Sequence, residues 1–214
     1  MNKWTVIIPT LWKSEYIHEQ LKEYIWSDYI SEIILIDNSS QYYDHHKKIY
    51  NKVKLIQPDE NLFVNPSWNL GVEKSSNENI IIANDDILWN TQVLEQITDK
   101  ILNEYSVLGQ IPENYIKGKN IEFIKENKIK TLEFIDNNTR RPTAWGCLLF
   151  TTKTNWKPIP NELKIWYGDD WIITKSKSKT GKIKNMLIGG AINASETPEF
   201  SGKRNQDRIN FKKL

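Results

Sequence analysis

Short apolar runs alternate with longer amphipathic stretches through the first half of the chain, and this alternation limits the fold more than any other feature. Three runs contain no polar residue, namely Val6–Ile8, Ile33–Ile36 and Ile80–Ala83. A fourth strand is predicted at Val53–Ile56. Wholly apolar strands are typical of a parallel sheet whose two faces are both covered by helices. The sequence therefore predicts an α/β fold with a mainly parallel central sheet, and 214 residues fit a single domain.

Amphipathic helices are predicted between these runs. Residues 14–25 carry apolar side chains at every fourth position. Asn65 and Pro66 fit the N-cap and first turn of a second helix. In the first strand, Pro9 is expected to mark the end. Further helices are predicted over residues 43–51 and 93–102.

The second half is less regular. Strands are predicted at Leu132–Ile135, Trp145–Thr151 and Met186–Ile188. A helix is predicted over residues 171–180, with Gly181 as its C-cap. Beyond residue 194 the chain is polar, so residues 195–214 are expected to form a tail or a linker, with a possible further domain after it.

Charge and cysteine content narrow the class of protein. The net charge of +2 is too small to indicate a nucleic-acid partner. No run approaches the roughly 20 apolar residues of a membrane span. The single cysteine, Cys147, cannot form an internal disulfide. Because the N-terminus enters directly into a predicted strand, we expect no signal peptide. A cytoplasmic location is the expectation.

Three polar clusters directly follow predicted strands: Thr10, Asp37–Ser40 and Asn84–Asp86. Right-handed crossovers bring the carboxyl ends of parallel strands to one edge of the sheet, where ligands bind in such folds. We therefore expect the three clusters to line one rim.

Each acidic cluster has a functional and a structural interpretation. The adjacent carboxylates of Asp85 and Asp86 repel each other unless a cation lies between them, which suits Mg²⁺ or Mn²⁺ shared with phosphates; the alternative is an Asx-rich turn. The turn at Asp37 can bind a nucleoside or be an ordinary strand-to-helix turn. Asp169 and Asp170 can supply a general base or cap the next helix.

Basic residues add a fourth candidate. Arg140 and Arg141 can clamp a diphosphate through bidentate hydrogen bonds, or can simply lie on the surface. The chain has no P-loop, Gly-x-Gly-x-x-Gly motif, nucleophile elbow or Cys/His zinc spacing. This argues against nucleotide hydrolysis, nicotinamide chemistry, serine hydrolysis and structural zinc.

Taken in order, these motifs resemble the GT-A fold glycosyltransferases of the inverting family-2 type. The resemblance covers roughly residues 3–190. The segments that carry it are VIIPT from Val6, EIILIDNSS from Glu32, NLFVNPSWNLGV from Asn61, IIIANDDI from Ile80, WGCLLF from Trp145 and YGDDWIITKSKSKTG from Tyr167. IIIANDDI is similar to the metal-binding DXD strand, and YGDD to the motif that holds the catalytic base.

The resemblance implies roles for individual residues. Asp170 would be the catalytic base, with Asp169 beside it, and Asp86 would bind Mn²⁺ or Mg²⁺. Trp145 or Trp166 would stack on a sugar ring. The residues implied for the nucleotide-sugar donor are Pro9, Thr10, Asp37, Asn38, Ser39, Asn69, Asn84, Asp85, Arg141 and Trp145.

The same resemblance implies a domain over residues 1–194, with a nucleotide-binding half to about 104 and an acceptor half from about 105. The expected reaction moves a sugar from a nucleoside-diphosphate donor, UDP above all, to a hydroxyl of a glycan or glycoprotein with inversion. The chain departs from the family because residues 191–196 lack a late histidine ligand. Its size resembles small viral capsid-glycosylating transferases of the chlorella-virus kind. The alternatives are a nucleotidyltransferase on a similar fold and a non-catalytic nucleotide-sugar-binding module.

Overall fold

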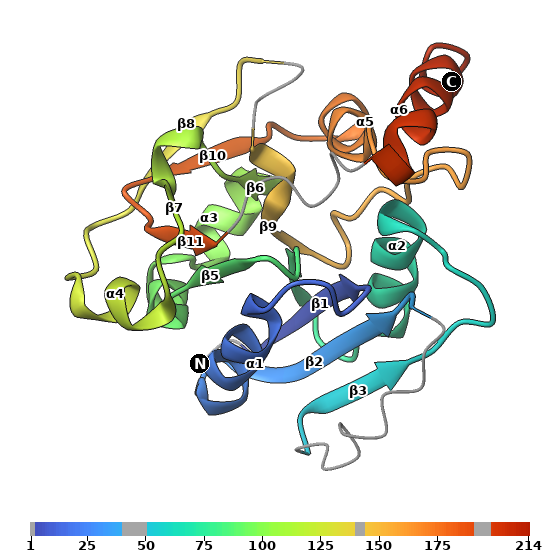
Figure 1. The fold of residues 1–214 in the computed structure, drawn as a ribbon. Coiled ribbons are helices and arrows are strands. Elements are labelled where there is room, and N and C mark those ends of the chain that lie inside the picture. Colours follow the sequence, from blue (N-terminus) through green and yellow to red (C-terminus); the bar gives the residue numbers. More distant parts are fainter. Residues whose placement is uncertain (1–2, 40–50, 140–143, 191–197) are drawn as a thin grey trace.

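The central sheet of the computed structural model has eight strands in the order β3-β2-β1-β4-β9-β6-β10-β8 (Figure 1). The structure describes residues 3–39, 51–139, 144–190 and 198–214. Six strands run in one direction, and β9 and β8 run in the other. This confirms the α/β class with a mainly parallel sheet. The strands are β1 (Trp4–Thr10), β2 (Ile30–Asp37), β3 (Val53–Ile56), β4 (Asn79–Ala83), β6 (Val107–Gly109), β8 (Glu133–Asp136), β9 (Leu148–Thr152) and β10 (Gly181–Lys184).

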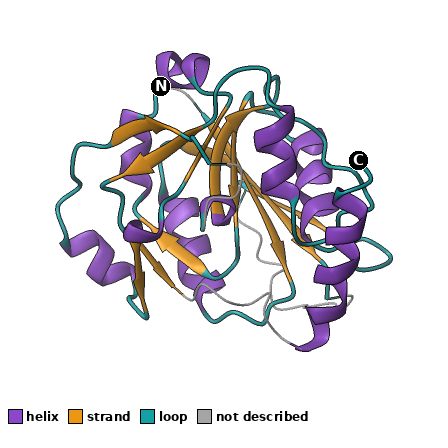
Figure 2. Cartoon of the chain, turned by 90° about the horizontal axis from the view of Figure 1, so that it is seen from above, coloured by secondary structure: helices purple, strands orange, loops and turns teal. Residues whose placement is uncertain are grey.

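Successive residues of a strand point to opposite faces of a sheet. In this sheet both faces are covered by helices. On one face Ile8, Leu35 and Ile81 belong to a core cluster that includes residues of α1 (Tyr16–Trp26) and α3 (Asp99–Glu104). On the other face lies a second cluster with residues of α2 (Val64–Lys74) and α5 (Gly168–Lys175). Figure 2 shows helices on both sides of the strands. The apolar runs of the sequence are therefore buried from two sides, as their composition predicts.

The strand register brings the expected polar clusters to one edge. Thr10 and Asp37 are partners at the end of the β1–β2 ladder, and Ala83 ends the neighbouring strand β4. Because β9 is antiparallel to β4, its first residue Leu148 pairs with Ala83. The backbone N–H of Asn84 then donates to the carbonyl of Cys147 at 3.0 Å. The turn before β9 thus meets the turn after β4.

The first strand extends beyond its expected end at Pro9. It continues to Thr10, pairing with β2 throughout, whereas its pairing with β4 stops at Ile7. Proline lacks a backbone N–H and is tolerated where a ladder hydrogen bond is not required. Pro9 lies beyond the β4 ladder, so it ends one pairing and not the strand.

Two predicted helix boundaries are wrong. The residue before α2 is Phe63, with φ of 66°, so Asn65 lies inside the helix and does not cap it. The helix predicted over residues 171–180 is α5, which begins earlier, at Gly168, and ends earlier, at Lys175. Gly181 opens strand β10, where a Cβ atom would lie 2.5 Å from the Tyr105 ring. Glycine there permits close packing and does not end a helix.

Short elements make up much of the chain after β4. The helix expected over residues 93–102 is divided into a 3-10 helix, Thr91–Gln96, and α3. The strand expected from Trp145 begins instead as a 3-10 turn, Trp145–Cys147. A second sheet has the order β5-β11-β7, formed by Ile87–Trp89, Ile188–Gly190 and Tyr115–Lys117. A 3-10 helix, Pro112–Asn114, and α4, Ile121–Glu126, lie between its strands in the chain. The predicted helix over residues 43–51 lies almost wholly outside the described residues.

The expected polar tail contains a helix, α6 (Pro198–Phe211), that lies beside α5 and above α2 (Figure 1). Its Asp207 is fully buried. None of the helices in the described part of the chain has the length and apolar character needed to cross a lipid bilayer. The boundary at residue 194 stays a prediction.

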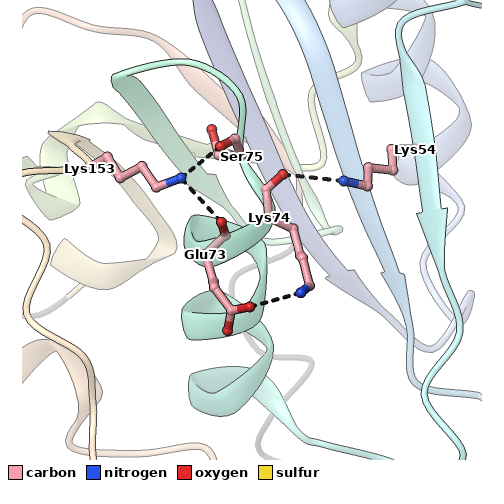
Figure 3. A network of polar contacts seen from close by, with 5 residues as sticks. All are labelled: Lys54, Glu73, Lys74, Ser75 and Lys153. Atoms are coloured by element: carbon pink, nitrogen blue, oxygen red, sulfur yellow. Dashed lines mark hydrogen bonds and ion pairs between the residues drawn. The ribbon is translucent and has the colours of Figure 1, made fainter.

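Lysines cap the carboxyl end of α2 at the opposite edge of the sheet (Figure 3). Lys153 donates to the carbonyls of Glu73 and Ser75 at 3.1 and 2.8 Å, and Lys54 donates to that of Lys74 at 3.3 Å. Cations at a helix carboxyl end satisfy its free carbonyls and complement its dipole. This network fixes the far end of α2 and leaves its amino end to the site.

Candidate active site

The turn after β2 is closed by its own side chains. One carboxylate oxygen of Asp37 accepts hydrogen bonds from the backbone N–H and the hydroxyl of Ser39, at 3.0 and 2.6 Å. Its other oxygen accepts from Gln57 at 3.2 Å. The Asn38 side chain donates to Ser67 of α2 at 3.0 Å. The turn is therefore fixed to α2, with Ser39 at its end.

A hydroxyl–carboxylate contact joins the turns after β1 and β4. Thr10 Oγ1 donates to Asp85 Oδ2 at 2.7 Å and accepts from the N–H of Trp12 at 2.8 Å. The backbone N–H of Asn38 donates to the Thr10 carbonyl at 2.8 Å. The structure thus brings Asp37, Thr10 and Asp85 into one continuous rim, as the sequence predicts.

Burial raises the pKa of Asp85, and hydrogen bonds from Thr10 and from backbone N–H groups only partly oppose this shift. Desolvation disfavours a charged carboxylate unless donors or a cation compensate. The rim is therefore an environment in which added positive charge would stabilise ionised Asp85.

The turn after β4 is held from the helix side by Gln20 of α1. Its amide Nε2 donates to the carbonyls of Asn84 and Ile87, at 2.9 and 2.6 Å. Asp86, between them, is buried. The conformation that presents Asp85 and Asp86 is therefore set by a side chain 64 residues away from Asn84 in the chain.

A cleft of about 400 Å³ opens beside this turn. It receives Asn84 from the end of β4, Gly146 and Cys147 from the turn before β9, and Asp169 and Asp170 from the first turn of α5. Its other lining residues are Val64, Asn65, Trp68, Ala144, Ile165, Trp166, Tyr167 and Arg204. The cleft therefore brings the turn after β4, through Asn84, together with the two carboxylates of α5, whereas Asp37, Asp85 and Asp86 are not among its lining residues.

Electrostatics connect Asp86 to the same region. Burial raises the pKa of the Cys147 thiol to about 12, and the negative charges of Asp86 and Asp169 contribute to this rise. Burial also raises the pKa of Tyr115, with a contribution from Asp86. The charges of Asp86, after β4, and of Asp169, in α5, thus both raise the pKa of the same thiol.

The first turn of α5 is shaped by a close approach. A Cβ atom at Gly146 would lie 3.2 Å from the Cβ of Asp169. Glycine at position 146 therefore leaves room for the Asp169 side chain. Asp169 Oδ1 accepts from the N–H of Asp170 at 3.0 Å. Asp169 therefore binds the start of its own helix, as the structural alternative predicts, and it does so inside the cleft.

Left-handed backbone conformations surround the site. Phe63, Ala144 and Tyr167 have φ between 59° and 66°, and each directly precedes a helix that borders the cleft. Trp12, after the Thr10 turn, has φ of 57°. This conformation is costly for residues other than glycine, and it persists where the surrounding structure requires a particular geometry. Of the five such non-glycine residues in the described part of the chain, three directly precede helices that border the cleft, and this supports a functional site there.

The sequence matches the profile of one protein family, described as "Glycosyl transferase family 2", over residues 5–155. The chain belongs to this family. The match includes β1, β2, β4 and β9, and hence the turns at Thr10, Asp37 and Asp86. It ends before α5 and α6.

Several solved structures share this fold. S. aureus TarS 1–349 in complex with UDP is 18% identical, has a TM-score of 0.64, and is matched over 97% of this chain and 64% of that one. The same protein in complex with UDP-GlcNAc is 17% identical, with a TM-score of 0.62, over 97% and 66%. GalNAc-T7 with UDP, GalNAc and Mn²⁺ is 13% identical, with a TM-score of 0.59, over 89% and 44%.

At these identities the likeness concerns the fold, which is the GT-A fold expected from the sequence. The chain spans less than two thirds of the length of these structures. A comparison with curated proteins finds no match to the sequence.

Two residues that the family-2 resemblance assigns to the donor have structural roles instead. Trp145 is fully buried, and its indole N–H donates to the Gly181 carbonyl at 2.9 Å, so it offers no face to a sugar. Asn69 donates to the Ile159 carbonyl and accepts from the Trp156 indole and the Ile159 N–H. Both of its polar groups are therefore used within the fold.

The remaining residues that the resemblance assigns either lie at or beside the site or fall outside the described residues. Trp166, the second candidate for stacking, lines the cleft. Pro9 lies in β1 beside the Thr10 turn. Arg140 and Arg141 lie outside the described residues, as does the segment that lacks the late histidine.

Four residues at the site have no recognisable functional signal in the sequence: Gln20, Asn65, Arg204 and Asp207. Gln20 resembles any polar residue on a helix, and Asn65 resembles an N-cap. Asn65 instead donates to the carbonyls of Leu163 and Trp166, at 3.2 and 3.3 Å. The partners of these residues lie far away in the chain, so local patterns give no indication of them.

The described residues contain no group of three or more His, Cys, Asp or Glu side chains arranged to hold a metal ion. A Mg²⁺-type ion needs fewer, because it is commonly bound by one or two carboxylates together with substrate phosphates and water. The carboxylates of Asp85 and Asp86 meet that requirement in type and number. They fit an ion shared with a phosphorylated ligand and do not form a closed metal cage.

Proposed function

We propose that this family-2 domain is a metal-dependent glycosyltransferase that moves a sugar from a UDP-type donor to a hydroxyl acceptor with inversion at the anomeric carbon. The observation that carries the proposal is the shared cleft, which is lined by Asn84 of the turn after β4 and by Asp169 and Asp170 of α5. A second cavity, of about 370 Å³, is lined by residues in and beside α1 and α4 and includes none of the turns that follow the sheet strands. The UDP and UDP-GlcNAc complexes of TarS support the choice of donor class.

The nucleoside of the donor would lie along the rim formed by Thr10, Asp37 and Ser39. The carboxylate of Asp37 still has acceptor capacity, because two oxygens offer about four lone-pair sites. Asn38 and Asp85 fix the two turns that face the nucleoside. These residues orient the donor and do not take part in bond making.

The divalent cation, Mn²⁺ or Mg²⁺, would be held by Asp86 with Asp85 beside it. When bound, the cation neutralises charge that develops on the departing diphosphate. The raised pKa of Asp85 fits this role, because a nearby cation would favour its ionised form.

Asp170 would act as the general base. The Asp169 carboxylate already accepts the N–H of Asp170 and lies against Gly146, so it orients the helix start. Asp170 lines the same cleft and would take the proton of the acceptor hydroxyl as its oxygen attacks the anomeric carbon. The diphosphate leaves from the opposite face, and this single displacement inverts the configuration.

The acceptor would enter past Trp166, whose partly exposed ring can stack on a sugar. A glycan or glycoprotein acceptor fits this open side. A capsid glycoprotein, the acceptor of the viral type that the short chain resembles, is one member of the acceptor panel.

The direct test incubates the protein and Mn²⁺ with a panel of nucleotide sugars and glycan acceptors. We expect UDP release and a transferred sugar of inverted configuration, read by NMR of the product linkage. Asp170→Asn should lower transfer by about 10²–10⁴-fold, the usual contribution of a general base. UDP binding should survive this substitution, because Asp170 removes a proton and does not hold the nucleotide.

Glu113→Ala, an exposed change in a short 3-10 helix, is the matched control and should leave transfer unchanged. Absence of nucleotide release with every donor would refute the transferase assignment. Retention of configuration would refute the single displacement.

A further inference from the structure

One face of α6 is directed at the cleft. Phe200, Arg204, Asp207 and Phe211 follow one another at intervals of four, three and four residues, which places them on the same side of a helix. Arg204 lines the cleft and Asp207 is fully buried. The Phe211 ring stacks on Tyr167, with centroids 5.2 Å apart and planes inclined by 23°. This helix follows the part of the chain that matches the family profile.

The carboxylate of Asp207 is satisfied by one loop. Its oxygens accept from the backbone N–H groups of Lys164, Ile165 and Trp166 at 3.0, 2.8 and 3.0 Å. A buried carboxylate is costly unless hydrogen bonds compensate its lost hydration, and charge-assisted bonds of this kind are strong. The contact therefore fixes three successive residues of the loop.

The same loop is held from its other side by α2. Asn65 donates through its side chain to the carbonyls of Leu163 and Trp166, and its backbone N–H donates to the carbonyl of Lys164 at 3.0 Å. The N–H groups of the loop thus point to α6, and its carbonyls point to α2. The loop must keep one conformation to satisfy both sets of contacts.

This loop leads directly into the proposed catalytic helix. Trp166 is followed by Tyr167, whose φ of 65° makes the turn into α5, and then by Gly168, Asp169 and Asp170. The stack with Phe211 holds the Tyr167 ring at this turn. The position of Asp170 therefore depends on a loop whose last residue, Trp166, is fixed through its backbone N–H by Asp207.

We propose that Asp207 is a positioning residue that sets the direction of the α5 helix start and thereby places Asp170 against the acceptor hydroxyl. The proposal rests on the proposed function, in which Asp170 is the general base. Asp207 acts through the loop and touches no reacting atom. A misplacement of about 1 Å in a reacting group can lower the rate about 100-fold.

The test uses Asp207→Asn in the full chain. Asparagine keeps the size of the side chain but replaces one acceptor oxygen with an N–H₂ donor, which would face a backbone N–H. We expect transfer kcat to fall about 10- to 100-fold. The dissociation constant for UDP with Mn²⁺ should stay within about twofold, because the turns at Asp37 and Asp86 belong to other elements.

Phe211→Leu is a second variant that weakens the same turn without disturbing a buried charge, and it should lower kcat in the same direction. Arg208→Ala, on the exposed side of α6, is the matched control and should behave as the wild type. All assays are run well below the melting temperature of each variant.

Hydrogen exchange provides a readout that does not depend on activity. In Asp207→Asn the amides of residues 164–170 should exchange about 10-fold faster or more, while those of residues 84–86 keep their rates. A folded Asp207→Asn protein with wild-type kcat and unchanged exchange at residues 168–170 would overturn the proposal. Parallel losses of kcat and UDP affinity would overturn it too, since they indicate general destabilisation. If the wild type transfers no sugar, the proposed function fails, and the exchange pattern still decides whether Asp207 positions α5.

Discussion

Cys147 is affected by the charges of both Asp86 and Asp169, and it is the only cysteine in the sequence. It lines the cleft, next to Gly146 and opposite the turn at Asn84. With a pKa of about 12, set first by burial, about one thiol in ten thousand is ionised at pH 8, and the thiolate is the reactive form. This makes Cys147 a chemical probe of the cleft.

We expect alkylation of Cys147 by iodoacetamide at pH 8 to be far slower than that of a cysteine in a short peptide, and to rise steeply between pH 8 and pH 10. UDP with Mn²⁺ should slow it further by covering the cleft. Mass spectrometry of the intact protein measures the rate. Labelling at the peptide rate, or a rate indifferent to UDP and Mn²⁺, would show that the thiol is not in a nucleotide site.

Residues differ in how far the sequence reveals their roles. Asp37 and Asp85 come just after apolar runs, and Asp170 comes just before an amphipathic stretch, so their neighbours in the chain indicate where they lie. Asp207 and Asn65 have partners 41 to 43 and 98 to 101 residues away. A polar residue of this kind looks like surface until the fold brings its partner to it.

Among the elements, α1 holds the turn after β4 through one side chain. Gln20 is buried, and its amide donates to both carbonyls that flank Asp85 and Asp86. In Gln20→Leu these two carbonyls would lose their donor. An unsatisfied buried acceptor costs about 1–3 kcal/mol, so we expect the free energy of unfolding to fall by about 2–4 kcal/mol.

Urea denaturation measures this change, and Lys22→Ala on the exposed side of α1 is the control. Gln20→Leu should also weaken UDP binding in Mn²⁺, because the turn that presents Asp86 loses its support. Wild-type stability together with wild-type UDP affinity would remove Gln20 from the site.

The length of an element decides whether the sequence predicts it. The strands β1, β2 and β4 are long and apolar on both faces, and the sequence predicts all three. By contrast β5, β6 and β7 have three residues each, too few for a periodic pattern. The start of β10 resembles the end of a helix in the sequence, because glycine serves both as a C-cap and as a site of close packing.

At the scale of the whole molecule, the site lies at the edge of the sheet where the parallel strands β1, β2 and β4 end. This edge follows from strand–helix alternation and right-handed crossovers, so the sequence predicts it. The cleft itself depends on β9, which runs against its neighbours and brings Gly146 and Cys147 to the end of β4. It also depends on α6, which holds the loop before α5. Neither contribution follows from local patterns.

If the edge binds a metal–nucleotide complex, the complex should stabilise the whole domain, since a ligand that binds only the native state adds RT ln(1 + [L]/Kd) to its stability. At about a hundred times Kd this is about 2.7 kcal/mol, which corresponds to a rise in melting temperature of about 5–10 °C for a domain of this size. We expect UDP with Mn²⁺ to give this rise and UDP with a chelator to give much less.

In Asp86→Ala the difference between the two conditions should disappear, because the carboxylate that holds the cation is gone. Differential scanning fluorimetry measures both proteins in both conditions, and equal shifts with and without Mn²⁺ in the wild type would refute the metal site while leaving the nucleotide site intact.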